Sequence, residues 1–541
     1  MKCVSRCERG SETGANSIRT PVVRGNMRTV RASALAILGL ACCCLTAPTL
    51  VAGEAPPPPR FDEADGPERI NRRWLDDFEH LKAELEASYP NLLWKASFES
   101  DVDLPAIALA AERALRRATA DHEAFEAIAA FVEGIGDGHL YVADAEQSVG
   151  PLPSEARDLF DDAASACASI GYVNFDGGAY SLPFEAAGRF ELIRGSPVSG
   201  FRTGIVTTVS GQKVAVVRVA SFLSANLVEG CEAAFPTVSM PATHADWPRW
   251  CSASCVARLR DETIARSIAF LRRDLELAWR RGAQTLLIDL GQNPGGEGWA
   301  WDLAQSLATR PLDAPELGVV ADGRLDRYLS VETEELHARA HDTRDDPATR
   351  EAALAAHNAL LKFRIDVTSS TPCDLSWVWS ERRAWSVDAV WQCGRVARLP
   401  QDASGRLVLD GTALAPEKRM SRGLELDVEK IGWRGALAVL VDRHSVSAAE
   451  LFAGYLQDAG AAVIIGEQTR GAGCGFIGYH RSPIVLPSSG LQVVAPDCII
   501  LRKDGRNSVA GVRPDVAIDR SHPENLALFA ARIVKAASPR T

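Results

Sequence analysis

Beyond its first 53 residues, this 541-residue sequence contains no long apolar run. No later stretch approaches the ~20 consecutive apolar residues that a membrane-spanning helix needs, so no integral membrane span is predicted there. Positive charge is also scarce. The formal net charge is −11, and because the first 53 residues carry a net +5, the remainder carries −16. That balance argues against nucleic acid and against an anionic membrane surface as partners.

Histidine or cysteine pairs at zinc-ligand spacing are missing as well. No such pair accompanies Cys251 and Cys255 in CSASC, so structural cysteines are the preferred interpretation and no metal site or organic cofactor is predicted. Eight of the 13 cysteines lie beyond the first 53 residues, and an even number in an exported protein favours disulfides. Two pairs are preferred because each brackets a compact segment: Cys373 with Cys393, and Cys474 with Cys498.

The first 53 residues have the three parts of an export signal. Arg28 and Arg31 supply positive charge, ALAILGLACCCLTAPTL is the apolar core, and VAG offers small residues for cleavage before Glu54. Met27 is a second candidate start, because the residues ahead of it lack signal character. The expected location of the mature protein is therefore the periplasm or the exterior of the cell.

Two alternatives to a cleaved signal stay open. One is an anchor helix that is retained. The other is a lipoprotein signal around Cys42, Cys43 and Cys44, although Gly39 stands where such signals usually carry leucine.

The length predicts about two to four domains. Composition and pattern divide the chain into an export signal (1–53), a Pro-rich tether (54–69), an N-terminal helical domain (70–145), a connecting segment (146–204), the first part of a core (205–320), a helical, Cys-containing insertion (321–428), the second part of the core (429–520) and a C-terminal helix or tail (521–541). The insertion is interpreted as a candidate lid over a cleft.

Buried strands alternate with helices in both parts of the core. GIVTTVSGQKVAVVRVASF reads as a hairpin around Ser210 and Gly211, and the apolar strands TLLIDL, ALAVLV and AAVIIGE neighbour helical patterns. This alternation predicts an α/β layered core. Amphipathic helices are expected before the core, and the last of them leads into the turn GDGHLYV.

Ser447 stands where the strand ALAVLV ends and the helix AAELFAGYLQ begins. A hydroxyl at that junction lies beside the free N–H groups and the positive dipole end of the helix, which suit an oxyanion formed by attack on a carbonyl. A plain N-cap is the structural alternative, and Glu450 three residues later completes a capping box. Ser445 is a second candidate with a weaker placement.

Two further loops supply candidate residues. In LIDLGQNPGG, Gly295 and Gly296 leave a backbone that can donate an N–H to a developing negative charge, although a tight turn explains the same residues. In GIGDGHLYV, His139 is a candidate general base for a serine, and Asp137 is a candidate group to orient it. The alternative for His139 is a solvated loop histidine.

Together these motifs resemble those of the C-terminal processing (tail-specific) peptidases and the related tricorn-type proteases. The matching elements follow the family's order: N-x-G-G at 293–296, S-x-S-A-x-E at 445–450, Q-D-x-G and G-E-x-T-x-G at 457–471, and G-V-x-P-D at 511–515. The resemblance covers residues 285–307 and 435–518 and is weaker around His139. It implies a serine peptidase with a crotonase-like (ClpP/crotonase) α/β core.

By this resemblance Ser447 is the nucleophile. The implied oxyanion hole consists of backbone amides, those of Ala448 with Gly295 or Gly296. Bacterial processing peptidases use a lysine in G-E-x-T-x-G-K-G as the base, but Ala472 stands at the lysine position here, and a methyl group cannot accept a proton. The tricorn-like branch uses a histidine from a D-G-H-like element, which His139 matches.

The group that orients the base is left open. A glutamate usually precedes G-V-x-P-D in the tricorn-like branch, whereas this sequence has Ser508 near that place and Asp504 as the nearest acid. Asp504, Ser508 and Asp137 are therefore all candidates. His444 and His480 are spare candidates for the base itself.

The sequence thus predicts an exported serine endopeptidase that acts on proteins or peptides through a Ser–His acyl-enzyme, without metal or cofactor. No clear PDZ pattern occurs in residues 146–204, so recognition of a protein's C-terminus is not expected. The alternative is a catalytically inactive protein that keeps the fold to bind peptides or small apolar ligands, which the missing glutamate and the insertion favour. An α/β-hydrolase esterase is a third hypothesis, but no G-x-S-x-G elbow surrounds Ser447.

Overall fold

The structure is a computed structural model that describes residues 67–143, 162–239, 253–313, 315–343, 347–399, 430–476, 483–518 and 526–537. Contacts divide the chain into two units, Met1–Ala55 and Pro56–Thr541, and all of these residues belong to the second. The predicted export signal lies outside the described residues. Among the helices of the described ranges, none is long and apolar enough to cross a membrane.

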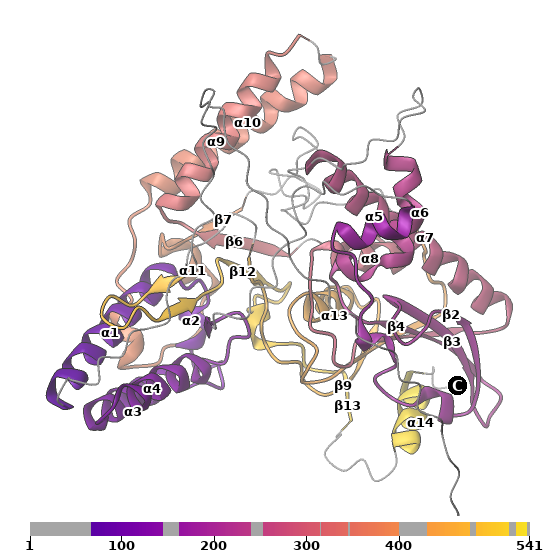
Figure 1. Cartoon of the computed structure of the whole chain (residues 1–541), viewed down its shortest axis with the longest axis horizontal. Coiled ribbons are helices and arrows are strands. Elements are labelled where there is room, and N and C mark those ends of the chain that lie inside the picture. Colours follow the sequence, from indigo (N-terminus) through magenta and orange to yellow (C-terminus); the bar gives the residue numbers. More distant parts are fainter. Residues whose placement is uncertain are drawn as a thin grey trace, which may run out of the picture. The chain divides into compact units, whose positions relative to one another are not determined.

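A seven-stranded sheet has the strand order β13-β9-β8-β5-β4-β3-β2. Its strands β2, β3, β4, β9 and β13 are labelled in Figure 1. Neighbouring strands from β13 to β4 run parallel, whereas β3 and β2 are added antiparallel. The strands are β2 (Arg189–Arg194), β3 (Phe201–Thr207), β4 (Lys213–Val219), β5 (Thr285–Asp289), β8 (Ala436–Val441), β9 (Val463–Gly466) and β13 (Val516–Ala517). The hairpin predicted around Ser210 and Gly211 is confirmed as β3 and β4.

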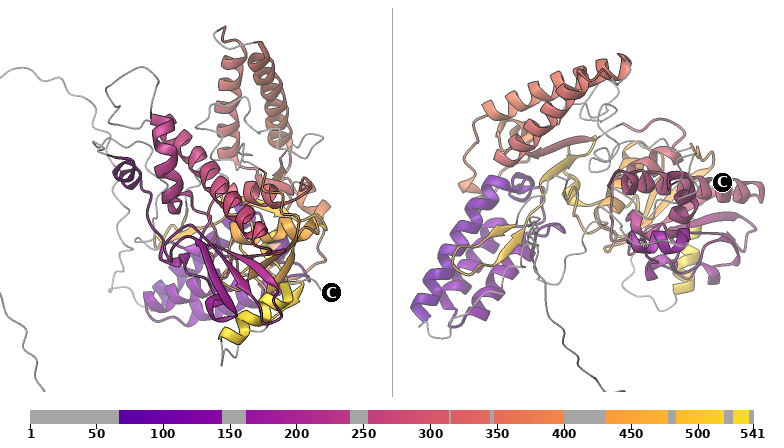
Figure 2. Two further views of the ribbon diagram at one scale, coloured as in Figure 1. Left: turned by 90° about the vertical axis from the view of Figure 1, so that its right-hand side faces the viewer. Right: turned by 45° about the horizontal axis from the view of Figure 1, so that its top comes forward.

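Helices cover both faces of this sheet. Successive side chains of a strand point to opposite faces, so in β5 Leu286 and Ile288 enter one hydrophobic cluster and Leu287 enters another. The first cluster includes residues of α7 (Ala253–Arg280), α8 (Trp299–Leu307) and α13 (Ala448–Asp458). The second includes α14 (Leu526–Ala537), drawn in yellow, which packs against β5, β8 and β9 (Figure 2). The α/β fold class is confirmed, and the finer crotonase-like assignment stays a prediction.

Helices α1 (Pro67–Ser88), α3 (Leu104–Arg117) and α4 (Asp121–Gly134) pack together ahead of the sheet in sequence. Trp74, Phe78, Leu81 and Leu85 recur every three or four residues and are buried, which is the pattern of one apolar helix face. Their cluster also contains apolar residues from 375–393 and 484–495. Strand β1 (Tyr141–Val142), which follows the His139 turn, pairs with β11 (Gln492–Val494).

The region predicted as an insertion contains the helices that its sequence pattern indicates. They are α9 (Gly323–Ala340) and α10 (Pro347–Ser369), which lie side by side (Figures 1 and 2). Strands β6 (Glu316–Val320) and β7 (Val396–Arg398), which flank these helices in sequence, form an antiparallel sheet with β12 (Cys498–Leu501), which comes much later in the chain. The order of this sheet is β12-β6-β7. Whether this region acts as a lid stays a prediction.

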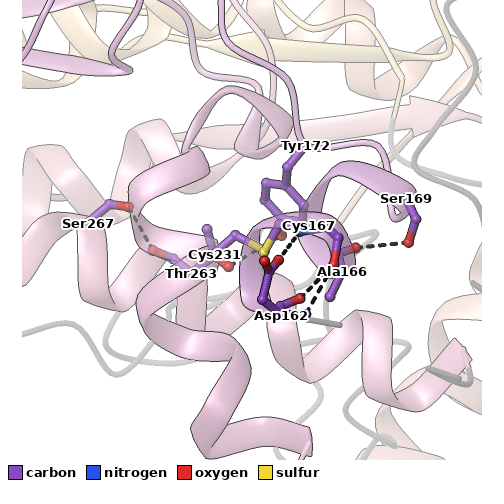
Figure 3. The surroundings of a disulfide bond; sticks show 9 residues. Asp162, Ala166, Cys167, Ser169, Tyr172, Cys231, Thr263 and Ser267 are labelled. Atoms are coloured by element: carbon purple, nitrogen blue, oxygen red, sulfur yellow. Dashed lines mark hydrogen bonds between the residues drawn. A yellow bond between two sulfur atoms is a disulfide. The ribbon is translucent and has the colours of Figure 1, made fainter. Parts of the chain in front are cut away.

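Three disulfides join described cysteines. Cys373–Cys393 and Cys474–Cys498 confirm the two predicted pairs. The third, Cys167–Cys231, joins α5 (Ala163–Ser169) to α6 (Val228–Ser239), beside Tyr172 (Figure 3). No sequence feature singled out this third pair, because its cysteines are 64 residues apart and bracket no compact segment. Cys255 is disulfide-bonded as well, in agreement with a structural role.

Candidate active site

Ser447 lies at a strained turn between β8 and α13. Its φ is 55° and its ψ is −120°, and Gln292, with a φ of 60°, is the other non-glycine residue with positive φ among those described. Such conformations cost on the order of 1–3 kcal/mol each and persist only where surrounding contacts hold them. The two strained loops are joined, because the Val446 N–H donates to the Asn293 carbonyl at 3.0 Å.

Ser447 is more than a helix cap. Its hydroxyl faces the Glu450 N–H as in a capping box, but that N–H donates to the Ser447 carbonyl at 2.9 Å, and the side chain makes no cap hydrogen bond of normal geometry. The side chain of Ser447 is half-buried. A hydroxyl that is not committed to the cap is available for other chemistry.

The carboxylate of Glu450 holds this turn. It is buried and accepts hydrogen bonds from the Ser447 N–H at 2.8 Å, the Thr469 hydroxyl at 2.5 Å, the Gly471 N–H at 2.7 Å and the Ala472 N–H at 2.9 Å. Burial raises the pKa of the Glu450 carboxyl, and these four donors oppose the rise. One side chain therefore fixes both Ser447 and the loop that contains Ala472.

Ser445, the second candidate nucleophile, is fully buried. Its hydroxyl donates to the Leu290 carbonyl at 2.8 Å and accepts from the Asp442 N–H at 3.0 Å. These bonds tie the end of β8 to the end of β5. The hydroxyl of Ser445 is thus used for structure and is not presented to a substrate.

Asn293 fixes the glycine loop after β5. Its buried amide donates to the Val219 carbonyl at 2.9 Å and accepts from the Gly295 N–H at 2.8 Å. A methyl group added to Gly295 would lie 2.8 Å from the Ser447 Cβ and 3.1 Å from the Ala448 nitrogen. The loop therefore lies directly against the serine turn, and only glycine fits there.

Gly296, not Gly295, offers an available N–H. The Gly295 N–H is already bonded to Asn293. Around Gly296, the Phe222 N–H donates to the Gly295 carbonyl at 2.7 Å and the Glu297 N–H to the Phe222 carbonyl at 2.8 Å, so the Gly296 N–H points to the opposite side. Within the described part of the chain, no hydrogen-bond partner is found for the Gly296 or Ala448 N–H.

His139 lies in the turn that follows α4. The backbone N–H of His139 donates to the Asp137 carboxylate at 2.9 Å. That carboxylate also accepts from the Tyr89 hydroxyl at 2.8 Å and the Asn91 side-chain amide at 3.0 Å. Asp137 therefore shapes the backbone of the turn, and its carboxylate is engaged by these three donors. The imidazole instead has its Nδ1 3.0 Å from the Ala472 carbonyl oxygen.

The His139 turn and the Ser447 turn meet at Ala472. A methyl group added to Gly138 would lie 2.8 Å from the Ala472 Cβ and 3.6 Å from the Val446 Cγ1. Gly138 precedes His139 and Val446 precedes Ser447, so two stretches about 300 residues apart in sequence become neighbours. The residue at the family's lysine position thus contacts the histidine that was proposed to replace the lysine.

A family model for peptidase family S41 matches residues 260–518, which include the glycine loop, the Ser447 turn and the Ala472 loop. Residues 260–518 are thus similar to peptidase family S41. This similarity supports a peptidase that acts on peptides or proteins.

Two solved structures of mature CPAF are similar in fold to this chain. Mature CPAF is 15% identical, with a TM-score of 0.50 over 87% of this chain and 98% of that chain. Mature CPAF complexed with lactacystin is 14% identical, with a TM-score of 0.50 over 87% of this chain and 99% of that chain. The photosystem II D1 C-terminal processing protease matches at 14% identity and a TM-score of 0.29, over 85% of this chain and 97% of that chain.

The acidic and hydroxyl candidates for orienting the base are not bonded to the imidazole among the described residues. Asp504 is exposed and pairs with Arg506 at 2.6 Å. Ser508 is buried beside Gly473, and its hydroxyl has no partner among the described residues. Of the spare histidines, His444 is exposed, and His480 lies outside the described residues.

Lys95 is a buried charged residue beside the candidate site, and it was not singled out from the sequence. It ends the short helix α2 (Leu92–Lys95), is almost fully buried, and donates to the Gly136 carbonyl in the His139 turn at 2.9 Å. Burial lowers the pKa of the Lys95 ammonium, and the carboxylates of Asp137, Glu450 and Asp101 oppose this. The surrounding sequence, NLLWKASF, contains no motif that could have marked it.

Proposed function

We propose that this protein is an exported serine endopeptidase in which Ser447 forms an acyl-enzyme and His139 acts as general base. The observation that carries the proposal is the meeting of the His139 and Ser447 turns at Ala472, with both the Ser447 and the Ala472 N–H held by Glu450. Two turns fixed by one buried carboxylate have the rigidity that proton transfer between their side chains requires.

The tautomer of His139 follows from its partner. Because a carbonyl oxygen only accepts, the Nδ1 that faces Ala472 must carry the proton, which leaves the Nε2 lone pair to take the proton of the Ser447 hydroxyl. The serine oxygen then attacks the peptide carbonyl. The protonated imidazole returns the proton to the leaving amine, and water releases the acyl group with His139 again as base.

The oxyanion of the tetrahedral intermediate is assigned to the N–H groups of Gly296 and Ala448. Both are uncommitted in the described structure, whereas the Gly295 N–H is bonded to Asn293. Ala448 is also the first residue of α13, so the positive end of the helix adds to the stabilisation. Of the two glycines considered from sequence, we therefore favour Gly296 as the donor and Gly295 as the close-packing residue.

The third member of the catalytic set is the main-chain carbonyl of Ala472. Asp504, Ser508 and Asp137 make no hydrogen bond to the imidazole in the described structure, whereas the Ala472 carbonyl lies 3.0 Å from Nδ1. A neutral carbonyl orients the ring as a carboxylate would, but it stabilises the imidazolium less, because it bears no full charge. We therefore expect a competent but slow enzyme.

Export is supported by the sequence of the leader and by the disulfides. Three disulfides join described cysteines, and such bonds persist in oxidising compartments. The substrate proposed is an unfolded protein or peptide, in the periplasm or outside the cell. The division into an N-terminal helical domain, a two-part core and an insertion is retained as part of this proposal.

Serine-directed labelling tests the assignment. Wild-type protein should react with a fluorophosphonate probe and hydrolyse an unfolded protein, whereas Ser447→Ala should do neither. His139→Gln should keep Ser447 but lose most of both activities, and His444→Ala, which changes an exposed histidine nearby, should retain them. Hydrolysis by Ser447→Ala at the wild-type rate would refute the proposal.

A catalytically inactive binding protein is the second candidate. It is favoured by the serine at position 508, where the tricorn-like branch usually has a glutamate. On that alternative, peptides would bind to the wild-type protein, but the fluorophosphonate would label neither the wild type nor any variant.

A further inference from the structure

One short segment surrounds the imidazole of His139 on several sides. The Ala472 carbonyl faces Nδ1 at 3.0 Å. A methyl group on Gly475 would lie 2.8 Å from the ring atoms Cδ2 and Nε2, so its backbone is packed against the ring. The ring of Phe476 meets the imidazole edge-to-face, with 5.9 Å between ring centroids. Residues 472–476 are here called the base-holding segment.

The base-holding segment has no regular secondary structure to stiffen it. Gly473 within it, and Gly471 just before it, have positive φ, and glycine is the residue with the greatest freedom to leave such conformations. Glu450 fixes its start through the Gly471 and Ala472 N–H groups. Its far end is held at Gly475, whose carbonyl accepts from the Asp497 N–H at 2.9 Å.

A covalent link fixes the middle of the same segment. Cys474 is disulfide-bonded to Cys498, which is fully buried in β12 opposite Val319 of β6. Cys474 itself is half-buried and stands between the two residues that contact the imidazole most closely, Ala472 and Gly475. The disulfide therefore attaches the surroundings of the base to an antiparallel sheet.

We propose that the Cys474–Cys498 disulfide is a positioning element for His139, so that the peptidase loses rate when the bond is reduced. This rests on the proposed function, because it assumes that His139 is the base. Without the bond, the glycine-flanked segment is free to shift between its two remaining attachments. The imidazole then leaves its reactive orientation for part of the time, and a misplacement of about 1 Å can cost about a hundredfold in rate.

A dithiol reagent reduces the Cys474–Cys498 bond by supplying two electrons and two protons. Each cysteine sulfur ends as a thiol, and the reagent closes to a cyclic disulfide. The half-buried Cys474 is the sulfur more open to attack. No group held by the protein is consumed.

Paired double variants test the proposal. Cys474→Ala with Cys498→Ala should lower kcat about tenfold or more while KM stays within about twofold, because the base and not the substrate contact is disturbed. The control removes the disulfide of Figure 3, by Cys167→Ala with Cys231→Ala. The Cys167–Cys231 bond links residues 64 apart in sequence, whereas Cys474 and Cys498 are 24 apart. Loss of the control bond should therefore destabilise the fold at least as much, yet kcat should remain close to wild type.

Reduction of the intact protein provides a second, independent readout. Dithiothreitol should slow the wild type to about the rate of the Cys474/Cys498 variant and should slow that variant no further. Thermal unfolding of both double variants identifies any loss of rate that is caused by unfolding alone. Equal kcat losses in the two double variants, or an unchanged kcat in the Cys474/Cys498 variant, would overturn the proposal.

The outcome is separable from that of the proposed function. If Ser447→Ala removes fluorophosphonate labelling but the Cys474/Cys498 variant behaves as wild type, the peptidase assignment stands and the positioning role fails. If wild-type protein is never labelled, the assignment itself fails.

Discussion

At the scale of single residues, substitution of Gly475 gives the most specific test of His139 as the proposed base. Its φ lies outside the left-handed region, so alanine fits the backbone, but the new methyl group would lie 2.8 Å from two ring atoms of His139. That is closer than carbon atoms approach, so the ring must move. We expect Gly475→Ala to lower kcat about 10- to 100-fold with little change in KM or melting temperature.

A matched glycine substitution controls for the change in chain entropy. Gly323 begins α9, and a methyl group there would have no neighbour within 4 Å. Gly323→Ala should therefore keep wild-type kcat and the same or slightly higher stability. Steady-state kinetics on both variants measures these effects. An unaltered kcat in Gly475→Ala would show that the His139 imidazole does not act as the base from the position seen in the structure.

Residue-scale features were predictable only where a side chain carries the signal. The motifs led to Ser447, to Gly295 and Gly296, and to His139, because a hydroxyl, a missing side chain and an imidazole each have a recognisable chemistry. The carbonyl of Ala472 was out of reach, since every residue has a carbonyl and only the fold selects one. The sequence also did not show that Glu450 holds two loops together. Its position indicated only a helix cap, whereas three of the four groups that donate to its carboxylate belong to residues 469–472.

At the scale of elements, the loop between β5 and α8 depends on Asn293. Its two hydrogen bonds connect the end of β4 to Gly295, so Asn293→Ala leaves the buried Val219 carbonyl without its donor and frees the Gly295 N–H. We expect the free energy of unfolding to fall by about 1–3 kcal/mol. We also expect kcat to fall about tenfold or more, because the Gly296 N–H loses its fixed direction.

Denaturant titration and steady-state kinetics separate these two effects. Both proteins should be assayed at a temperature where each is fully folded. A kcat equal to wild type in folded Asn293→Ala would contradict the idea that this loop must be held rigid for catalysis.

Elements were largely predictable, whereas their partners were not. Apolar β-branched runs gave β3, β4, β5, β8 and β9, and helical periodicity gave α1 and α13, because these patterns are local. The pairing of β1 with β11 joins residues about 350 apart, and β12 pairs with β6 instead of with a sequence neighbour. Such contacts depend on which apolar faces meet after folding, and two-residue strands leave almost no pattern to read.

At the scale of the whole molecule, the N-terminal helices and the α/β core both contribute residues to the proposed site. His139 follows α4, Ser447 precedes α13, and the apolar cluster of the N-terminal helices is completed by residues 484–495. Buried Asp77 accepts from the N–H groups of Ser488 and Ser489 at 2.8 Å each. The proposed domain boundaries therefore describe the order of segments along the chain, while the proposed site needs both parts packed together.

Lys95 links this docking to pH. Burial holds its pKa below the ordinary value of 10.5, so between the folded-state pKa and 10.5 the unfolded chain binds more protons than the folded protein. The free energy of unfolding contributed by Lys95 is therefore lowest below the folded-state pKa and rises with pH through that window. Lys95→Met abolishes this titration, so the stability of wild type relative to the variant should increase as pH rises from neutral toward 10.5.

Urea unfolding of both proteins at several pH values measures this difference. Lys362→Met, which removes an exposed lysine from α10, is the matched control and should follow the wild-type pH dependence. Kinetics adds a functional check, because Lys95 donates to the Gly136 carbonyl in the turn that carries His139. Loss of that donor should lower kcat, since the turn that carries His139 then loses one of its fixed attachments. A stability difference that is constant with pH would mean that Lys95 is neither desolvated nor coupled to the carboxylates around it.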